Sequence, residues 1–108
     1  MLICVYFCFR RNDIIFLMKV RAHLFVSGKV QGVGYRIFMS EVALTHDLTG
    51  WVMNVPDTRL EAVFEGSKKA IKTAIKKCAE GIPSAVVTSV DVNWEESPEN
   101  FTAFMIRY

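Results

Sequence analysis

The chain has 108 residues, of which 52% are hydrophobic, and it carries a formal net charge of +2. This length suits one domain with a single core and leaves no room for a second domain. The charge is too small to indicate a nucleic-acid-binding protein, and three cysteines, an odd number, do not suggest a disulfide framework. We therefore expect a reduced, cytoplasmic location and no nucleic-acid partner.

Residues 1–17 differ in character from the rest of the chain. The apolar run at 1–9 is too short to cross a bilayer as a helix, and Arg10 and Arg11 follow it, whereas the positive charges of a signal peptide come first. A membrane-surface anchor stays open as an alternative. We favour an accessory extension at 1–17 followed by a domain of residues 18–108, and we expect no membrane partner.

The first regular elements are a predicted strand over residues 20–27 and a predicted helix over 34–46. Apolar residues alternate along the strand, as they do when one face of a strand is buried. These residues are Val20, Ala22, Leu24 and Val26. Apolar residues then recur at helical spacing, which predicts an amphipathic helix. They are Tyr35, Phe38, Met39, Val42 and Ala43.

The loop between this strand and this helix predicts an anion site. It contains Gly28, Gly32 and Gly34, and Arg36 follows in the first helical turn. Glycine lets successive main-chain N–H groups turn toward one point, and a helix N-terminus adds donors, while an arginine can bind two phosphate oxygens. The expected main-chain donors belong to Gln31, Gly32, Val33, Gly34 and Tyr35. The glycine spacing matches neither a Walker loop nor a dinucleotide fingerprint, so a loop shaped only for packing is the alternative.

The second half of the chain predicts the remaining elements. They are strands over 50–54, 60–65, 86–94 and 101–108, and a helix between Ser67 and Gly81. A hairpin at 55–59 joins the first two of these strands, since Pro56 and Asp57 favour a turn. In the fourth strand of the chain one face is expected to carry Val86, Thr88, Val90, Val92 and Trp94.

The order of these elements is that of a ferredoxin-like α+β sandwich. A helical crossover links the first two strands, so they should run parallel, and their C-terminal ends should lie at the same end of the sheet. Arg36 and Asn54 should therefore converge, although 18 positions separate them.

Several other polar side chains are assigned structural roles. His46 falls near a helix C-terminus, where the helix dipole favours positive charge. His23 is expected at the surface of its strand, and Cys78 in the core. A row of lysines four residues apart predicts a solvated helix face, with a nucleic-acid interface as the alternative. This row consists of Lys68, Lys72 and Lys76.

The residues at this edge limit the chemistry that the site can perform. Arg36 and main-chain amides can bind a phosphoryl group, and the Asn54 side-chain oxygen can hold a water. We recognise no metal cluster, nucleophilic cysteine or acid–base pair in the sequence, so no metal or cofactor is expected. A leaving group must then depart without protonation, as a carboxylate does and an alkoxide does not. An acyl or carbamoyl phosphate fits this requirement.

Two motifs resemble those of a known family. The string from Gly28 to Arg36 resembles the signature of the acylphosphatases, and the string from Gly50 to Asn54 resembles their second motif. The ending from Phe104 to Tyr108 is also similar to the family. The resemblance implies an antiparallel sheet of order 4-1-3-2 plus an edge strand, with two helices on one face. It also implies metal-free hydrolysis of acyl phosphates by in-line attack of water on phosphorus, with catalytic roles for Arg36 and Asn54.

Thr58 departs from the family pattern, which has glycine at this place. A β-branched residue resists positive φ, so we expect the hairpin to use another turn type. We further expect a monomer whose site accepts phosphate or sulfate. The alternative function is a non-catalytic, regulatory module that binds phosphate or another ligand on the same fold. Acylphosphatase-like domains also occur within larger proteins that handle carbamoyl phosphate, but a free-standing enzyme is the simpler account of this chain.

Overall fold

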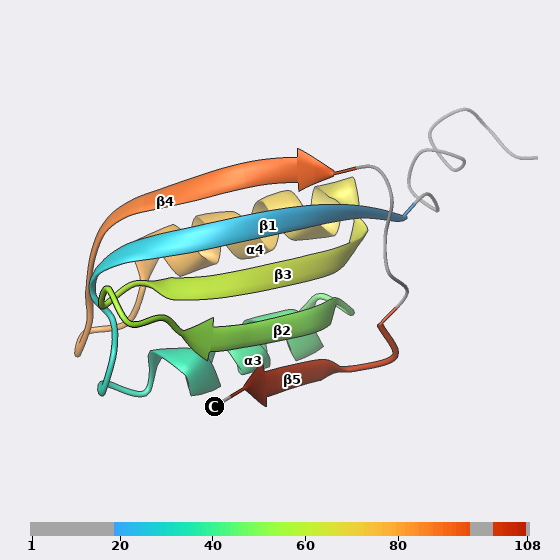
Figure 1. The fold of residues 1–108 in the computed structure, drawn as a ribbon. Coiled ribbons are helices and arrows are strands. Elements are labelled where there is room, and N and C mark those ends of the chain that lie inside the picture. The colour runs from blue at the N-terminus through green and yellow to red at the C-terminus, as the bar shows by residue number, and fades with distance from the viewer. Residues whose placement is uncertain (1–18, 96–100, 108) are drawn as a thin grey trace, which may run out of the picture.

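The computed structural model describes residues 19–95 and 101–107. Its elements are β1 (Lys19–Lys29), α3 (Tyr35–Thr45), β2 (Thr49–Asn54), β3 (Leu60–Ser67), α4 (Lys68–Glu80), β4 (Val86–Glu95) and β5 (Phe104–Arg107) (Figure 1). Each predicted strand and helix is present, and the closing strand is shorter than predicted. The extension predicted at 1–17 lies outside the described residues, so its accessory role stays a prediction.

The five strands form one sheet in the order β4-β1-β3-β2-β5. This confirms the predicted order 4-1-3-2 with an added edge strand. Strands β1 to β4 pair antiparallel, whereas β5 pairs parallel with β2, so the sheet is mixed and not purely antiparallel. The cause is topological: β4 and β5 lie at opposite edges, and the chain reverses between them, which gives β5 the direction of β2.

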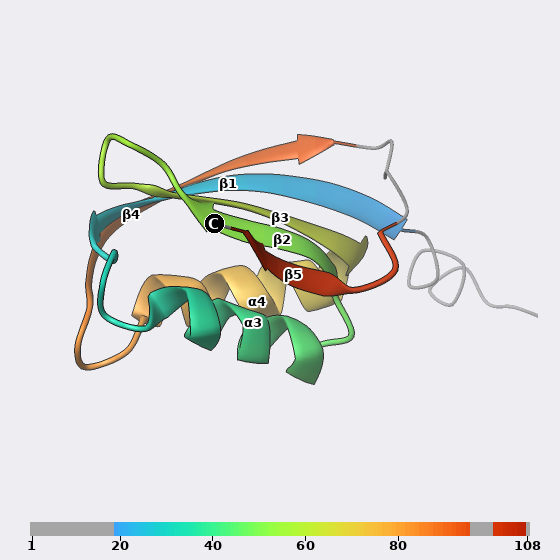
Figure 2. The ribbon, with the colours of Figure 1, turned by 60° about the horizontal axis from the view of Figure 1, so that its bottom comes forward.

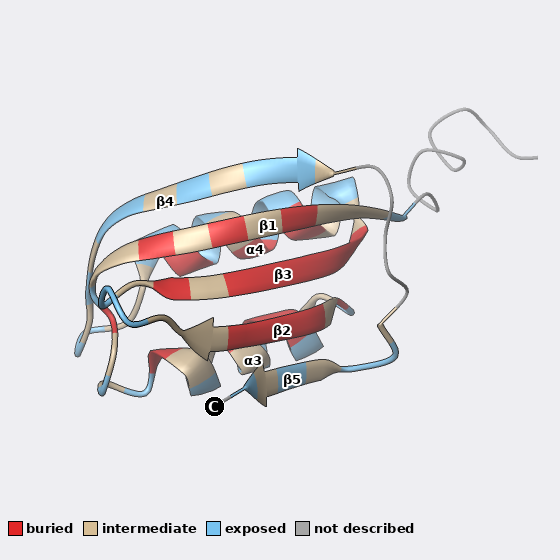
Figure 3. Ribbon diagram, in the orientation of Figure 1, coloured by how far each residue is buried: buried red, intermediate tan, exposed pale blue. Residues whose placement is uncertain are grey.

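Both helices cover one face of the sheet, and the core lies between them and the strands (Figure 2). The inner strands β1, β2 and β3 carry most of the buried strand residues (Figure 3). The alternation predicted for β1 is confirmed, because Ala22, Leu24 and Val26 are fully buried. The helices contribute Tyr35, Met39, Val42, Ala43, Ile71, Ala74 and Cys78 to the core. Removal of this apolar surface from water drives the packing of the helices on the sheet.

Strand β4 differs from the prediction at its start. Val86 is 58% exposed, whereas Val87 packs against the core together with Val90 and Val92. The pairing of β1 with β4 shifts between Ser27 and Gly28, which leaves Thr88 as an extra residue in β4. Such a β-bulge exchanges the two faces of a strand, so the alternation from Val86 does not continue through it.

Gly28 lies at the bulge and allows the close approach of the two strands. Its φ is +126°, and a Cβ atom there would lie 2.0 Å from the main-chain oxygen of Val86. A side chain at this position would therefore force β1 and β4 apart.

The hairpin between β2 and β3 contradicts the turn expected from Thr58. Val55 donates its N–H to the Arg59 oxygen at 3.0 Å, and Thr58 donates to the Val55 oxygen at 3.2 Å. Thr58 has a φ of 75°, so it adopts the left-handed conformation that favours glycine. The pattern is that of a three-residue hairpin loop, a β-turn followed by one left-handed residue.

Contacts on both sides of Thr58 maintain this conformation. The Asp57 carboxylate accepts hydrogen bonds from the Arg59 N–H at 3.2 Å and from its Nε at 2.8 Å. The side-chain hydrogen bond from Arg59 lowers the pKa of Asp57. Together with the hairpin bonds, these contacts outweigh the steric resistance of a β-branched residue.

We predict that Thr58→Gly stabilises the protein. Thr58 is exposed, so the substitution removes backbone strain without loss of packing. The gain should be about 1 kcal/mol in the free energy of unfolding, or a Tm higher by about 4–8 °C. Thermal unfolding followed by circular dichroism measures it. Thr58→Ala is the control, because alanine keeps a Cβ at positive φ; an equal gain in both variants would contradict relief of backbone strain.

The remaining polar side chains lie at the predicted positions, with one addition. His46 is the C-cap of α3, and Lys68, Lys72 and Lys76 are exposed on α4. His23 lies on the sheet face without helices, but it is only partly exposed: its Nε2 is 2.6 Å from Glu61 Oε2. In the described part of the chain, no helix is long and apolar enough to cross a membrane.

Cys78 lies in the core, as predicted, and its main-chain oxygen accepts a hydrogen bond from the Tyr35 hydroxyl. Burial raises the pKa of the Cys78 thiol to about 12, and it also raises the pKa of Tyr35. Both side chains are thus kept neutral, and Cys78 is a packing residue without nucleophilic character.

This burial predicts a loss of stability at alkaline pH. Below a pH of 9.0, the reference pKa of the thiol, Cys78 is neutral in the folded and unfolded chains alike. The contribution of its burial to the free energy of unfolding is then fully present. As the pH rises toward about 12, the unfolded chain ionises first, so the stability falls. Cys78→Ala should make the free energy of unfolding, measured with urea at several pH values, less steeply dependent on pH. Parallel pH profiles would contradict the assignment; Cys4 and Cys8 are present in both proteins.

Candidate active site

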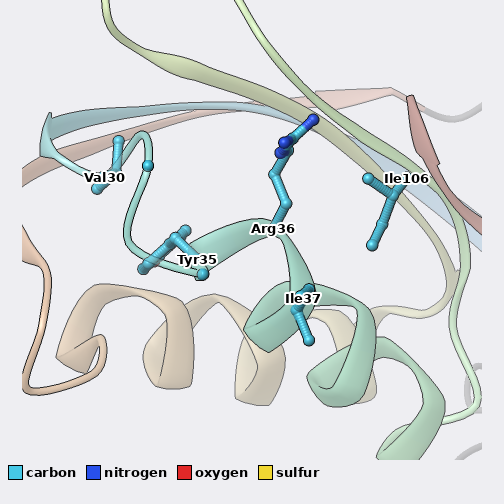
Figure 4. A pocket seen from close by; sticks show the side chains of 7 residues that line it. Val30, Tyr35, Arg36, Ile37 and Ile106 are labelled. Atoms are coloured by element: carbon cyan, nitrogen blue, oxygen red, sulfur yellow. The ribbon is translucent and has the colours of Figure 1, made fainter. Parts of the chain in front are cut away.

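A cavity of about 100 Å³ lies where the glycine loop meets α3 and β5 (Figure 4). It is lined by Val30, Gly32, Gly34, Tyr35, Arg36, Ile37 and Ile106. Three of the five residues predicted as main-chain donors line it, namely Gly32, Gly34 and Tyr35, and Arg36 lines it too. The predicted residues Gln31, Val33 and Asn54 are not part of the lining.

The loop glycines are needed for their backbone conformation. Gly32 and Gly34 have φ of 75° and 81°, and a Cβ atom at either position would meet nothing within 4 Å. The space at these positions would accept a side chain, so glycine is favoured there because of the positive φ. Gly34 is the N-cap of α3 and no side chain caps this end, so the first-turn N–H groups of the helix have no side-chain acceptor at the cap. A helix start of this kind suits an anion.

Arg36 is oriented by the last strand of the sheet. Its Nη1 donates a hydrogen bond to the main-chain oxygen of Arg107 in β5 at 3.2 Å. Figure 4 shows the Arg36 side chain extending between the loop at Val30 and the strand at Ile106. Arg107 places its own guanidinium 4.6 Å from the ring centroid of Trp51. A cation–aromatic contact thus stabilises the strand segment that positions Arg36.

Asn54 is the last residue of β2 and pairs with Leu60 of β3. Because β1 and β2 are both antiparallel to β3, they run in the same direction, and Asn54 lies at the edge from which the glycine loop leaves β1. Its Oδ1 is buried and has no hydrogen-bond partner among the described residues. A buried carboxamide oxygen without a partner is costly, which is a reason to expect a bound water or ligand there.

Gln31 joins the loop to the strand end that carries Asn54. Its side-chain Nε2 donates to the main-chain oxygens of Val55 at 2.8 Å and of Arg59 at 2.9 Å. These oxygens belong to the two residues that close the β2–β3 hairpin. The sequence predicts Gln31 as a main-chain donor to the anion, but no sequence pattern indicates this use of its side chain, because the partners are 24 and 28 positions away.

A comparison with protein-family models shows the family of this chain. The acylphosphatase model matches residues 22–106. The chain belongs to the acylphosphatase family. An acylphosphatase of Nostoc sp. is 47% identical over 88 residues, which cover 82% of this chain and 86% of the relative. An acylphosphatase of Natronomonas pharaonis is 45% identical, and the match covers 82% of this chain and 96% of the relative.

Solved structures agree with this membership. An acylphosphatase from Bacillus subtilis has a TM-score of 0.81 and 35% identity, over 82% of this chain and 99% of its own. HypF, solved in a phosphate- and nucleotide-bound form, has a TM-score of 0.76 and 27% identity, but the match covers 85% of this chain and only 12% of HypF. These matches support the predicted enzyme, an acylphosphatase, over a non-catalytic binding module.

We predict that Gln31→Ala impairs the turnover of acyl phosphates by this acylphosphatase. Loss of both hydrogen bonds frees the end of β2 from the loop, and displacement of a catalytic group by about 1 Å costs up to ~100-fold in rate. The kcat for benzoyl phosphate should fall by at least ~10-fold, while circular dichroism shows the folded state retained. Gln31→Met, of similar length but without the donor, should be equally impaired.

Ser84 offers a matched control for Gln31. Its hydroxyl donates to the Val33 main-chain oxygen at 3.1 Å, so it also contacts the loop but does not reach β2. Ser84→Ala should stay near the wild-type kcat. An equal loss in Ser84→Ala would mean that any weakening of the loop impairs turnover, and the specific role of Gln31 would be refuted.

Proposed function

We propose that this protein hydrolyses acyl phosphates to a carboxylate and inorganic phosphate, without a metal ion, through Arg36 and Asn54. The observation that carries the proposal is the cavity formed by the glycine loop, the start of α3 without a side-chain cap, and Arg36. Membership of the acylphosphatase family supports the same reaction.

The phosphoryl group is held by positive potential from several sources. The N–H groups from Gln31 to Tyr35 and the helix dipole of α3 bind the phosphoryl oxygens, and Arg36 offsets the charge that develops on them in the transition state. In the described part of the chain no three His, Cys, Asp or Glu side chains gather as a metal site. The arginine and the amides therefore supply the electrostatic stabilisation in this proposal.

Asn54 positions the attacking water. Its buried Oδ1 has no protein partner among the described residues and accepts a hydrogen bond from that water. The water oxygen forms a bond to phosphorus while the bond from phosphorus to the acyl oxygen breaks, and the carboxylate leaves with the electron pair. The proton of the water passes to a phosphoryl oxygen of the substrate, because an amide side chain cannot accept it.

The leaving group defines the class of substrate. A carboxylic acid has a pKa of about 4, so its anion departs without a proton donor. A simple alkoxide, whose parent acid is about as weak as water with a pKa of about 16, needs a general acid, and neither Arg36 nor Asn54 can act as one at neutral pH. Acyl phosphates are thus substrates, and simple alcohol phosphates are poor ones.

The proposal includes a monomeric, cytoplasmic enzyme. Cys78 is a free, buried thiol, which suits a reducing compartment. Inorganic phosphate, as product, and sulfate, as its analogue, are expected to occupy the loop and to compete with the substrate.

We predict that the full chain hydrolyses benzoyl phosphate, and not p-nitrophenyl phosphate, in the presence of a chelator. Arg36→Ala and Asn54→Ala should each lower kcat by about 100- to 1,000-fold. Arg36→Lys should also be poor, because an ammonium group cannot bind two oxygens in the planar geometry of a guanidinium. Asn93→Ala, in an exposed residue of the edge strand β4, is the control and should leave kcat unchanged. If Arg36→Ala kept most of the activity, the assignment of the site would be wrong.

A further inference from the structure

The wall of the cavity outside the glycine loop is aliphatic. Ile37 follows Arg36 in α3, Ile106 comes from β5, and both line the cavity together with the buried Val30. In the view of Figure 4, Ile106 lies on the far side of Arg36 from Val30, and Ile37 lies close to Arg36. Two branched aliphatic side chains from separate elements thus line the same cavity as Arg36.

Ile37 is unusually exposed for its size. It is 60% exposed, and it belongs to a small set of large apolar side chains that face solvent in the described residues. The others are Leu44, Val86, Trp94 and Met105, and none of these four lines the cavity. An exposed isoleucine in the lining of a cavity that also contains a cation offers apolar surface to the non-phosphoryl part of a substrate.

Among the described residues, Arg36 is the single charged side chain of the lining. The two arginines that come from neighbouring segments are engaged elsewhere: the Arg59 guanidinium lies 2.6 Å from Asp57 and 4.6 Å from the Phe25 ring centroid, and that of Arg107 lies over Trp51. Apart from Arg36, the described lining therefore offers no cationic partner to a second negative charge on the substrate. Desolvation of a charge without a partner is costly.

We propose that Ile37 and Ile106 form an apolar subsite for the acyl group, and that the enzyme prefers acyl phosphates with an uncharged hydrocarbon acyl group over those with a second carboxylate. The proposal rests on the proposed function, since the acyl group reaches this subsite only when the loop and Arg36 bind the phosphoryl group. Contact of a hydrocarbon with both isoleucines removes apolar surface from water.

The test compares acetyl, benzoyl and succinyl phosphate with the full chain and its variants. Ile37→Ser should lower kcat/KM for benzoyl phosphate by about tenfold, as for other losses of apolar contact in a substrate pocket, and leave acetyl phosphate nearly unchanged. Ile37→Lys should raise the ratio of kcat/KM for succinyl phosphate to that for benzoyl phosphate, because lysine offers a partner to the second carboxylate.

Leu44 is the matched control for Ile37. It is an exposed aliphatic residue of the same helix, 71% exposed, but it does not line the cavity. Leu44→Ser should change kcat/KM for none of the three substrates, so equal effects at both positions would overturn the subsite.

The kinetic results that would refute the subsite differ from those that would refute the enzyme function. If Ile37→Ser lowered kcat/KM for acetyl and benzoyl phosphate equally, the subsite would be refuted while acyl phosphate hydrolysis stood. If the unmodified protein hydrolysed none of the three substrates, the proposed function itself would be wrong and the subsite with it.

Discussion

Two hydrogen bonds from one side-chain amide connect the two halves of the site. The Gln31 Nε2 lies within 2.9 Å of the main-chain oxygens of Val55 and Arg59, and so holds the glycine loop against the closed end of the β2–β3 hairpin. In the proposed reaction the loop binds the phosphoryl group through main-chain N–H groups, and the direction of these groups depends on the whole backbone path. The hydrogen bonds from Gln31 to the neighbouring hairpin therefore help to maintain the direction of these groups.

The site combines three segments that the sheet topology brings to one place. The crossover through α3 makes β1 and β2 parallel, which puts the loop and Asn54 at one edge of the sheet. The edge strand β5 then adds the main-chain oxygen that binds Arg36, and its own Arg107 packs over Trp51 on the opposite face. Contacts on the face without helices thus contribute to the position of an arginine on the face that carries the helices.

Both the loop and the hairpin of the site contain residues with left-handed backbone conformation. Positive φ occurs at Gly32 and Gly34 in the loop, and at Thr58 in the hairpin that Gln31 contacts. The two glycines adopt it at little steric cost, whereas Thr58 adopts it only because hydrogen bonds on both sides determine the turn. The local preference of one residue is weaker than the combined geometry of a closed hairpin.

The sequence by itself determined the order of elements, the buried face of β1, the ferredoxin-like class and the glycine loop with Arg36. These follow from hydrophobic periodicity and from the conformational freedom of glycine, which act over a few residues. Tertiary structure alone decided the reversal of faces at Thr88, the parallel pairing of β5, the φ of Thr58, and the partners of Gln31 and Arg36. The φ of Thr58 follows from hydrogen bonds within the closed hairpin, which outweigh the preference of the single residue. The other features depend on atoms 24 or more positions away, or on a register shift against another strand, and residue patterns within one segment carry no information on such contacts.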